Sequence, residues 1–416
     1  MKAKNAFYLS LITLGAVACA GDNNAIVVNN DSPRDRHELV SLQLNPVESG
    51  RFAGRSVALK DAQGADVEYQ VTQDRCLVFV ADVKAGQKAV YNIVDEKPQE
   101  VKVVATGKVY PNRVDDIAWE NDKVAFRAYG PALQASGEKA FGYDVWVKCV
   151  SEPVVENRYN LELDPATNAR IDSLNNTKLY ADIEAAQKLR RETSYHYDHG
   201  NGLDCYKVGP TLGGGASAII LGDSIVYPYC YKECEILDNG PLRFQVRLTY
   251  HTTTIADQDI TEVRTITLDA ASCLNHTVVE YKGAPTNTNV VAGPVVHNPD
   301  GGTYVADAAN GFVGYADPTD RPSEGYGTIY VGAVFTQPIT DARLVLFPQE
   351  EAKMRGADGH VLAYSTLQAG QPLDYYWGGA WDKVGFDSFD AWKAYLDNFA
   401  QNLKQPLKVN FTHVDK

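Results

Sequence analysis

A strict alternation of apolar and polar residues constrains the fold of this chain more than any other feature. In LRFQVRLTYH, one face carries Leu242, Phe244, Val246, Leu248 and Tyr250, and the intervening polar side chains fall on the other face. A period of two is that of a β-strand with one buried face. YDVWVKCV, EVRTITLDA, HTVVEYKG, GTIYVGAVF and ARLVLFP read similarly, with turn sequences between them. Alternating βαβ units are not evident, so the pattern predicts a mainly β chain of antiparallel sheets.

The strand signals fall into two groups. Residues 26–105 carry short strand-like segments with turns at DAQGAD and KAGQKA, which predicts a small N-terminal β-sandwich. Residues 106–416 are predicted to form a second, larger β domain. Two helices are expected to interrupt its strands. One covers residues 181–192, and the other, beginning after Ser388, has one apolar stripe, which is assigned to core packing: Phe389, Trp392, Leu396, Phe399 and Leu403.

The N-terminal segment predicts export. Lys2 and Lys4 precede the apolar run AFYLSLITLGAVA, which ends in small residues before Cys19. A cysteine directly after AVA resembles the position that is lipidated in bacterial lipoproteins. We therefore expect a lipoprotein signal peptide over residues 1–19, a tether over 20–25, and a location in the periplasm or outer membrane. The alternative is an ordinary signal peptide in which Cys19 is incidental.

Charge and motif content restrict the classes of partner. The formal net charge of −14 argues against nucleic acid and anionic membrane surfaces, so the lipid is the only expected membrane contact. The sequence lacks phosphate-loop spacing, an H-E-x-x-H motif and an EF-hand loop, and no cofactor or metal is predicted. The abundance of tyrosine, with 24 residues, suits a β-protein with aromatic binding grooves.

The segment SYHYDHGNGLDCYKVGPTLGGG, residues 194–215, is the densest group of titratable side chains. If it is extended, His196 and Asp198 share one face, and Tyr197 and His199 share the other. Either histidine could then act as a base. If it is helical, the two histidines could ligate a metal, but GNGLD argues against a helix and a third ligand is not evident. The glycines of this segment indicate either a tight turn or a close approach of the backbone to a ligand.

Two further segments carry candidate side chains. NRVDDIAWEND combines a cation, several acids and an aromatic residue, and an acid pair can hydrolyse a glycosidic bond. LDYYWGGAWDKVG contains an aromatic cluster that either stacks against sugars or belongs to the core. The NRVDDIAWEND acids can equally be solvated carboxylates at a strand edge, and His297 and His360 are minor candidates in loops. The candidates in these segments are Arg113, Asp115, Asp116, Trp119, Glu120, Tyr376, Trp377 and Trp381.

Taken in order, these blocks resemble the DUF4861 family. The resemblance rests on RVDDIAWENDKVAFRAYGPAL, GYDVWVK, YHYDHGNGLDCYKVGPTLGGG, NGPLR, RTITLDA and YYWGGAWDKVG, and it runs from Ile26 to the C-terminus. It implies an exported protein of the polysaccharide-degrading gene clusters of Bacteroidota. It also implies a β-sandwich followed by a supersandwich of the galactose-mutarotase-like type. The family has no assigned reaction, and the fold does not choose one.

We therefore predict a carbohydrate-active enzyme that acts on complex, uronate-containing glycans. In a lyase version, Arg113 or Lys207 neutralises the uronate carboxylate. His196 or His199 then removes the C5 proton, and Tyr197 or Tyr206 protonates the leaving oxygen. In a hydrolase version, Glu120 acts with Asp115 or Asp116. The alternative is a non-catalytic glycan-binding lipoprotein.

Overall fold

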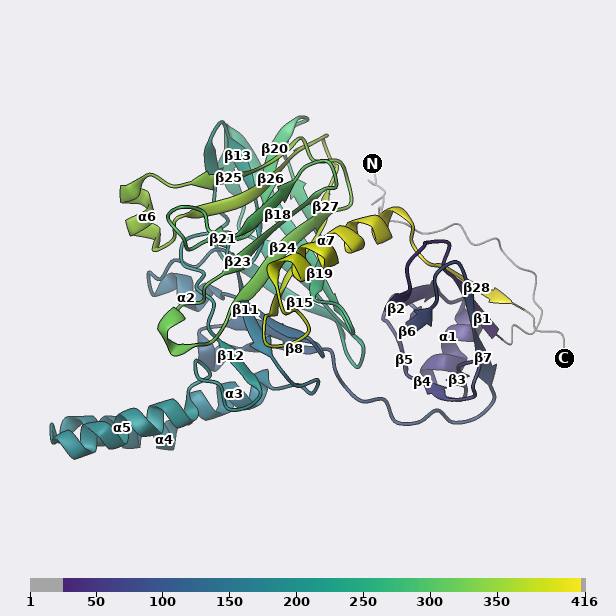
Figure 1. Ribbon diagram of the computed structural model, residues 1–416, viewed down its shortest axis with the longest axis horizontal. Coiled ribbons are helices and arrows are strands. Elements are labelled where there is room, and N and C mark those ends of the chain that lie inside the picture. Colours follow the sequence, from purple (N-terminus) through teal and green to yellow (C-terminus); the bar gives the residue numbers. More distant parts are fainter. Residues whose placement is uncertain (1–24, 413–416) are drawn as a thin grey trace, which may run out of the picture. The chain divides into compact units, whose positions relative to one another are not determined.

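The computed structural model describes residues 25–412, which form two compact units (Figure 1). One unit contains residues 25–101 together with 405–412, and the other contains residues 102–404. The predicted signal peptide and Cys19 lie outside the described residues. Within 25–412, no helix has both the length and the hydropathy that a membrane span requires.

The first unit is built from two antiparallel sheets and one helix. A five-stranded sheet has the order β28-β1-β7-β3-β4, and a three-stranded sheet has the order β2-β6-β5. Ile26, Leu77, Phe79 and Tyr91 belong to the one apolar core that the sheets share. Its elements are β1 (Ala25–Asn29), β2 (Arg36–Gln43), α1 (Pro46–Ala53), β3 (Ala58–Lys60), β4 (Asp66–Val67), β5 (Tyr69–Val71), β6 (Cys76–Val83), β7 (Lys88–Val94) and β28 (Lys408–Thr412).

The C-terminal strand β28 pairs with β1 along its whole length, from Ala25 opposite Thr412 to Asn29 opposite Lys408. The sequence-based division, which assigned residues 106–416 to one domain, did not include this pairing. A strand at the far end of the chain thus completes the N-terminal sheet.

The second unit begins with a five-stranded antiparallel sheet of order β12-β11-β10-β9-β8. Helices α3, α4 and α5 connect β11 to β12, and α4 and α5 extend from the β-structure as a hairpin (Figure 1). The elements are β8 (Thr106–Tyr110), η1 (Pro111–Arg113), β9 (Asp116–Glu120), β10 (Val124–Ala128), α2 (Pro131–Ala135), β11 (Tyr143–Lys148), α3 (Val155–Glu162), α4 (Pro165–Asn176), α5 (Tyr180–Thr193) and β12 (Gly202–Asp204).

Two larger sheets follow in this unit. One has the order β14-β13-β20-β26-β21, with β25 paired to β26, and the other has the order β15-β16-β18-β19-β27-β24-β23-β22, with β17 paired to β18. The elements are β13 (Ser217–Leu221), β14 (Ser224–Val226), β15 (Tyr231–Asn239), β16 (Arg243–Tyr250), β17 (Thr253–Ile255), β18 (Gln258–Asp269), β19 (Leu274–Lys282), β20 (Thr288–Ala292), β21 (Val295–Val296), β22 (Tyr304–Asp307), β23 (Phe312–Asp317), η2 (Pro322–Glu324), β24 (Ile329–Phe335), β25 (Asp341–Leu346), α6 (Gln349–Arg355), β26 (Gly359–Leu367), β27 (Leu373–Trp381) and α7 (Phe389–Lys404).

The prediction of a mainly β chain with antiparallel sheets is confirmed. In β16, Phe244, Val246, Leu248 and Tyr250 are buried, and the residues between them are partly exposed, as the alternation predicted. All seven β16–β18 pairs hold one antiparallel register. The pattern of β16 therefore reflects a strand with one face toward the core.

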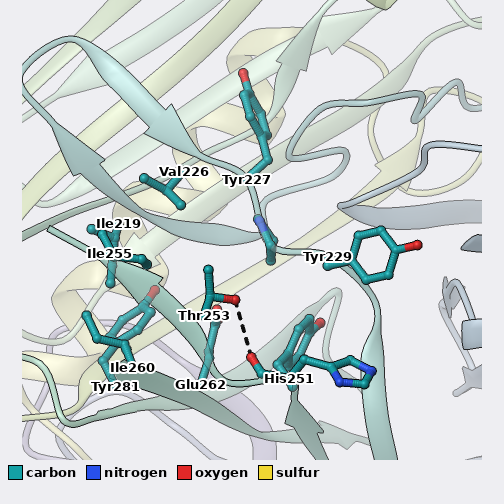
Figure 2. Close-up of a pocket in the computed structure, with 12 residues that line it drawn as sticks. Ile219, Val226, Tyr227, Tyr229, His251, Thr253, Ile255, Ile260, Glu262 and Tyr281 are labelled. Atoms are coloured by element: carbon teal, nitrogen blue, oxygen red, sulfur yellow. Dashed lines mark hydrogen bonds between the residues drawn. The ribbon is translucent and has the colours of Figure 1, made fainter. Parts of the chain in front are cut away.

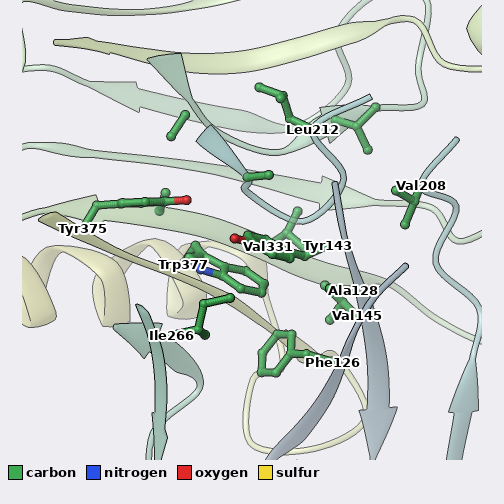
Figure 3. Close-up of a cluster of buried hydrophobic side chains, with 14 of the residues drawn as sticks. Phe126, Ala128, Tyr143, Val145, Val208, Leu212, Ile266, Val331, Tyr375 and Trp377 are labelled. Carbon is green, nitrogen blue, oxygen red and sulfur yellow. The ribbon is translucent and has the colours of Figure 1, made fainter. Parts of the chain in front are cut away.

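The core of the larger unit is rich in aromatic side chains. The ring of Trp377 stacks on Tyr143 with centroids 4.0 Å apart and also contacts Phe126 (Figure 3). The indole N–H groups of Trp377 and Trp119 donate to Thr277 Oγ1 and Asn275 Oδ1 at 2.8 and 2.7 Å. Satisfied indoles are what allow such large side chains to be fully buried.

The C-terminal helix α7 lies against β23 and β24 (Figure 1). Trp392 and Leu396 are fully buried, and the other residues of the predicted stripe pack around them. A Cβ at Gly314 or Gly332 would come within 2.8 Å of Leu396, so these glycines permit the close approach of the helix. The predicted core role of this stripe is confirmed, and Ser388 Oγ accepts from the N–H of Ala391 at 3.2 Å.

The structure has further helices besides the two that were located from sequence. Helix α5 was predicted, but α3 and α4 were not, because α4 buries a single apolar residue, Ile171, and has no clear apolar stripe. One local signal was available. Asp164 caps α4 by accepting from the N–H of Thr167 at 2.8 Å, and Pro165 occupies the first helical position.

Candidate acid–base site around His297

A histidine–aspartate pair lies where the two large sheets of the second unit meet. His297 follows β21, and Asp317 is the last residue of β23. Nδ1 of His297 lies 2.7 Å from Oδ2 of Asp317. The backbone N–H of His297 donates to Tyr315 Oη at 3.1 Å, and Tyr315 and Asp317 share one face of β23. One strand face therefore fixes both the backbone and the ring of this histidine.

The other ring nitrogen is left available. Nε2 of His297 is buried and has no hydrogen-bond partner within residues 25–412. A carboxylate at Nδ1 holds the proton on that nitrogen, so Nε2 carries the lone pair. This is the arrangement of a general base whose tautomer is set by an acidic partner.

Two hydroxyl groups in the same region also lack partners in the described chain: Tyr206 Oη and Thr319 Oγ1. The ring of Tyr206 lies 6.2 Å from that of His297 in an edge-on arrangement. Burial raises the pKa of Tyr206 well above its usual range, so this hydroxyl stays protonated and is a donor. An unpaired buried polar atom costs about 1–3 kcal/mol, so several of them together favour a site for ligand or water.

The loop after β23 is strained. Thr319 is buried and has a φ of +71°, a region that β-branched residues rarely adopt. Its N–H donates to Asp317 Oδ1 at 2.8 Å, so the strained turn holds the carboxylate that orients His297. Strain of this kind persists where the surrounding structure enforces it, which is common at functional sites.

The glycine-rich segment predicted from sequence runs along the same region. Gly213 O accepts from the N–H of Val295 at 2.8 Å, and the N–H of Leu212 donates to Nε2 of buried His360 at 3.2 Å. Tyr206 is positioned because Cys205 O accepts from the N–H of Asp320 at 2.8 Å. Lys207 is exposed, and its Nζ lies over Gly356, where a Cβ would come within 2.6 Å. The segment thus carries a buried hydroxyl at Tyr206 and an exposed cation at the next residue.

A buried ionic cluster lies directly behind this segment. Arg127 Nη2 contacts Asp144 Oδ2 and lies 2.9 Å from Asp204 Oδ2, with the three residues on neighbouring strands β10, β11 and β12. Burial and the charge of Asp144 raise the pKa of Asp204, which Arg127 opposes. Because Asp204 is two residues before Tyr206, the cluster fixes the start of the segment.

Residues of the segment 194–215 and of NRVDDIAWEND meet at this cluster. Arg113 Nε donates to Tyr195 Oη at 3.1 Å, and its Nη1 lies 3.5 Å from Asp116 Oδ2. Asp116 is fully buried, and burial raises its pKa to about 6 against the opposing charges of Arg127 and Arg113. Asp115 has a φ of +62°, and its carbonyl accepts from Tyr231 Oη. These groups form a packed network beneath the surface.

Other residues of NRVDDIAWEND and of the aromatic cluster are structural in this fold. Glu120 is ion-paired to Lys148 at 2.6 Å and accepts the N–H groups of Val154 and Val155. Trp119 and Trp377 are fully buried, and Trp381 is 4% exposed, with its indole N–H bonded to Tyr326 O. These aromatic residues therefore belong to the core, and among Tyr376, Trp377 and Trp381 only Tyr376 is half-buried.

The two histidines of the segment lie in a turn between α5 and β12. His196 Nδ1 lies 3.1 Å from the backbone oxygen of Asp204, and its side chain is 42% exposed. His199 is exposed, and its Nε2 lies 2.9 Å from Ser194 O. Asp198 is exposed and accepts from Gly200 and Gly202, while Tyr197 packs under the guanidinium of Arg321. No group of metal-ligating side chains is found among the described residues.

Four residues of the site and its supporting cluster were not predicted from sequence: Asp317, Thr319, Arg127 and Asp144. The available signals were an aspartate that ends an apolar strand and begins the turn DPTD, and charged residues inside the strands VAFRA and YDVWVK. A charge inside a buried strand needs a partner and marks a polar network. His297 was regarded as a minor substrate-binding candidate because its partner lies on another strand.

Comparison with known proteins gives one family. The model described as "Domain of unknown function (DUF4861)" matches residues 28–409. Among curated proteins, uncharacterized protein P7 of Formosa agariphila is 24% identical over 430 residues, which cover 97% of this chain and 98% of that protein.

Two solved structures from Enterococcus faecalis align with most of the chain. One is a protein in the glycosyl hydrolase family 38, with a TM-score of 0.46 and 8% identity over 94% of this chain and 47% of that one. The other is an alpha-mannosidase, with a TM-score of 0.42 and 9% identity over 94% of this chain and 46% of that one. The chain spans about half the length of both proteins.

Proposed function

The chain belongs to the DUF4861 family, whose model matches residues 28–409, and we propose that it is a carbohydrate-active enzyme. Its reaction in this proposal is β-elimination on a uronate-containing glycan, with His297 as the base. The supporting observation is the His297–Asp317 pair, whose outer nitrogen Nε2 is unpaired beside the unpaired hydroxyl of Tyr206.

The base acts through Nε2. Asp317 keeps the proton on Nδ1, so Nε2 can accept the C5 proton of the uronate. The electron pair of the C5–H bond forms the C4–C5 double bond, and the C4–O bond breaks. Asp317 then stabilises the imidazolium that results.

Tyr206 and Lys207 complete the site. Because burial keeps the Tyr206 hydroxyl protonated, it can transfer its proton to the leaving C4 oxygen, and solvent restores that proton. Lys207, exposed and next in the chain, neutralises the uronate carboxylate, which acidifies the C5–H bond. This assigns the base to His297 in place of His196 or His199, and it retains Tyr206 and Lys207.

The hydrolase version has less support. It needs two carboxyl groups that reach the glycosidic bond from opposite sides. Both carboxylate oxygens of Glu120 are already bonded, to Lys148 and to the N–H groups of Val154 and Val155, so Glu120 is not free to serve as one of the two.

The proposal also covers the type of fold and the cellular location. The six- and nine-stranded sheets of the second unit are consistent with a supersandwich of the galactose-mutarotase-like type, and the paired sheets of the first unit with a β-sandwich. We also propose export as a lipoprotein through Cys19, in the periplasm or outer membrane, so that the enzyme meets its glycan outside the cytoplasm.

The test is a screen of the full chain against uronate-containing and neutral polysaccharides, followed by ultraviolet absorbance and by reducing ends. Elimination produces an unsaturated uronate that absorbs in the ultraviolet, whereas hydrolysis produces reducing ends without that absorbance. Binding with neither product would favour the non-catalytic glycan-binding alternative. Reducing ends without absorbance would replace elimination with hydrolysis.

A further inference from the structure

A cavity with both polar and apolar walls lies apart from the His297 site. It has a volume of about 150 Å³ and opens between the edge of β13–β14 and strands β16–β19. In Figure 2, Ile219, Ile255 and Ile260 gather on one side, while Tyr229 and His251 stand on the other. We call this cavity the Tyr229 pocket; it is lined by Ile219, Val226, Tyr227, Pro228, Tyr229, Tyr250, His251, Thr253, Ile255, Ile260, Glu262 and Tyr281.

Glu262 is a fixed acceptor in the wall of the Tyr229 pocket. Its Oε1 accepts from Arg264 Nε at 2.5 Å. The same guanidinium donates to Tyr143 Oη at 2.8 Å and to Ser217 O at 3.0 Å, and it lies 4.6 Å over the ring of Tyr250. Arg264 is fully buried, so it holds Glu262 in one orientation. Such preorganisation favours recognition of a specific ligand over nonspecific contact.

Tyr229 offers a free aromatic face at the entrance. It is 51% exposed, and its hydroxyl reaches Gln134 O at 3.4 Å. The ring of Tyr227 is less available because the guanidinium of Arg355 lies 4.2 Å over it. Tyr229 is therefore the side chain on which a flat apolar surface of a ligand can stack.

We propose that the Tyr229 pocket binds one neutral pyranose unit. A pyranose has an apolar C–H face that suits Tyr229 and the isoleucines, and a rim of hydroxyl groups that can donate to Glu262 and exchange hydrogen bonds with Thr253 and His251. The volume equals that of about five water molecules at about 30 Å³ each, which is close to one sugar ring with its outer edge in solvent.

The charges of the pocket decide between sugar classes. A uronate carboxylate would lose hydration here without gaining a cation, because Arg264 is already paired with Glu262. A cationic ligand finds Glu262 already neutralised by Arg264. A neutral ring is compatible with both, so the pocket differs in specificity from the His297 site. The proposal does not depend on the elimination chemistry.

The test is saturation-transfer NMR and titration of the full chain with methyl glucoside, methyl galactoside, methyl mannoside and methyl glucuronide. We expect at least one neutral glycoside to bind and the glucuronide to bind at least about ten-fold more weakly. Tyr229→Ala should weaken neutral binding by about ten-fold. Because Tyr229 is half exposed, its removal leaves the core intact. Glu262→Gln should weaken neutral binding by a similar factor.

Tyr304→Ala is the matched control, since Tyr304 is 41% exposed on β22, outside the pocket. It should bind as the wild-type chain does, and so should His297→Gln, which separates this proposal from the elimination reaction. The proposal is overturned if none of the neutral glycosides binds, if Tyr229→Ala binds them normally, or if the glucuronide binds equally well.

Discussion

His297 and Asp317 join two sheets: the histidine follows β21 of the six-stranded sheet, and the aspartate ends β23 of the nine-stranded sheet, with Nδ1 and Oδ2 2.7 Å apart. Asp317 is fully buried and the His297 side chain is 12% exposed. The pair can therefore serve packing and catalysis together, and a substitution that keeps shape but changes charge separates the two roles.

Asp317→Asn should lower kcat for elimination by at least about 100-fold while leaving the fold intact. An amide keeps the volume and can still accept from Thr319, but it no longer holds the proton on Nδ1 of His297. The measurement is kcat together with the thermal midpoint. Asp300→Asn, an exposed carboxylate three residues from His297, is the control and should retain activity. Equal activity in both variants would refute the orienting role.

The buried Asp116 predicts a pH-dependent stability. Its pKa of about 6 exceeds the ordinary value of 3.8, so the folded state binds this proton more tightly than the unfolded chain does. The free energy of unfolding should therefore fall as pH rises from about 3 to about 7, by about 3 kcal/mol from this group. Asp116→Asn removes the effect, so its stability relative to wild type should rise over that window. Urea unfolding of both proteins at the two ends of the pH window measures this. A stability difference between them that does not change with pH would contradict the prediction.

The Glu120–Lys148 pair predicts a strong coupling. Each single change, Glu120→Gln or Lys148→Met, leaves a buried group without its partner and should destabilise the chain by about 3–5 kcal/mol. The double variant should recover much of that loss, since both charges are then absent. Denaturant unfolding of the four proteins measures the coupling. Additive losses would show that the pair is energetically independent.

Trp377→Ala should act on stability and not on binding alone. The side chain is fully buried against Tyr143 and Phe126, and large-to-small changes at such sites cost about 3–5 kcal/mol. Tyr180→Ala, at a side chain that is 77% exposed, should change stability by less than about 0.5 kcal/mol. Chemical unfolding compares the two variants with the wild-type chain. If Trp377→Ala is as stable as Tyr180→Ala, Trp377 does not contribute to the core.

The strands were accessible from sequence where one face is buried. The alternation of LRFQVRLTYH identified β16, and the apolar stripe identified α7, because each periodicity records a single buried face. Strand β11 was also identified, from YDVWVK, but it is buried on both faces, so Asp144 lies in the interior and the sequence gave no sign of its partner. Helix α4 escaped notice because its contacts are mostly with α5 and not with a core.

The candidate site was only partly accessible. The segment 194–215 was identified by its density of polar residues and glycines, and it does run beside His297. The acids Asp116 and Glu120 were interpreted as solvated because they are polar. Both are buried, with cationic neighbours in η1 (Arg113), β10 (Arg127) and β11 (Lys148). The partner of His297 is 20 residues away on another sheet, and that contact depends on tertiary structure.

The most direct test of the central claim is kcat/KM of two histidine variants on the polysaccharide from which the wild-type chain forms unsaturated product. His297→Gln should lose at least about 100-fold, because it removes the base. His199→Ala should stay within about two-fold, because that histidine is exposed and bonded to a backbone oxygen. A full loss in His199→Ala with normal turnover in His297→Gln would contradict the assignment of His297 as the base.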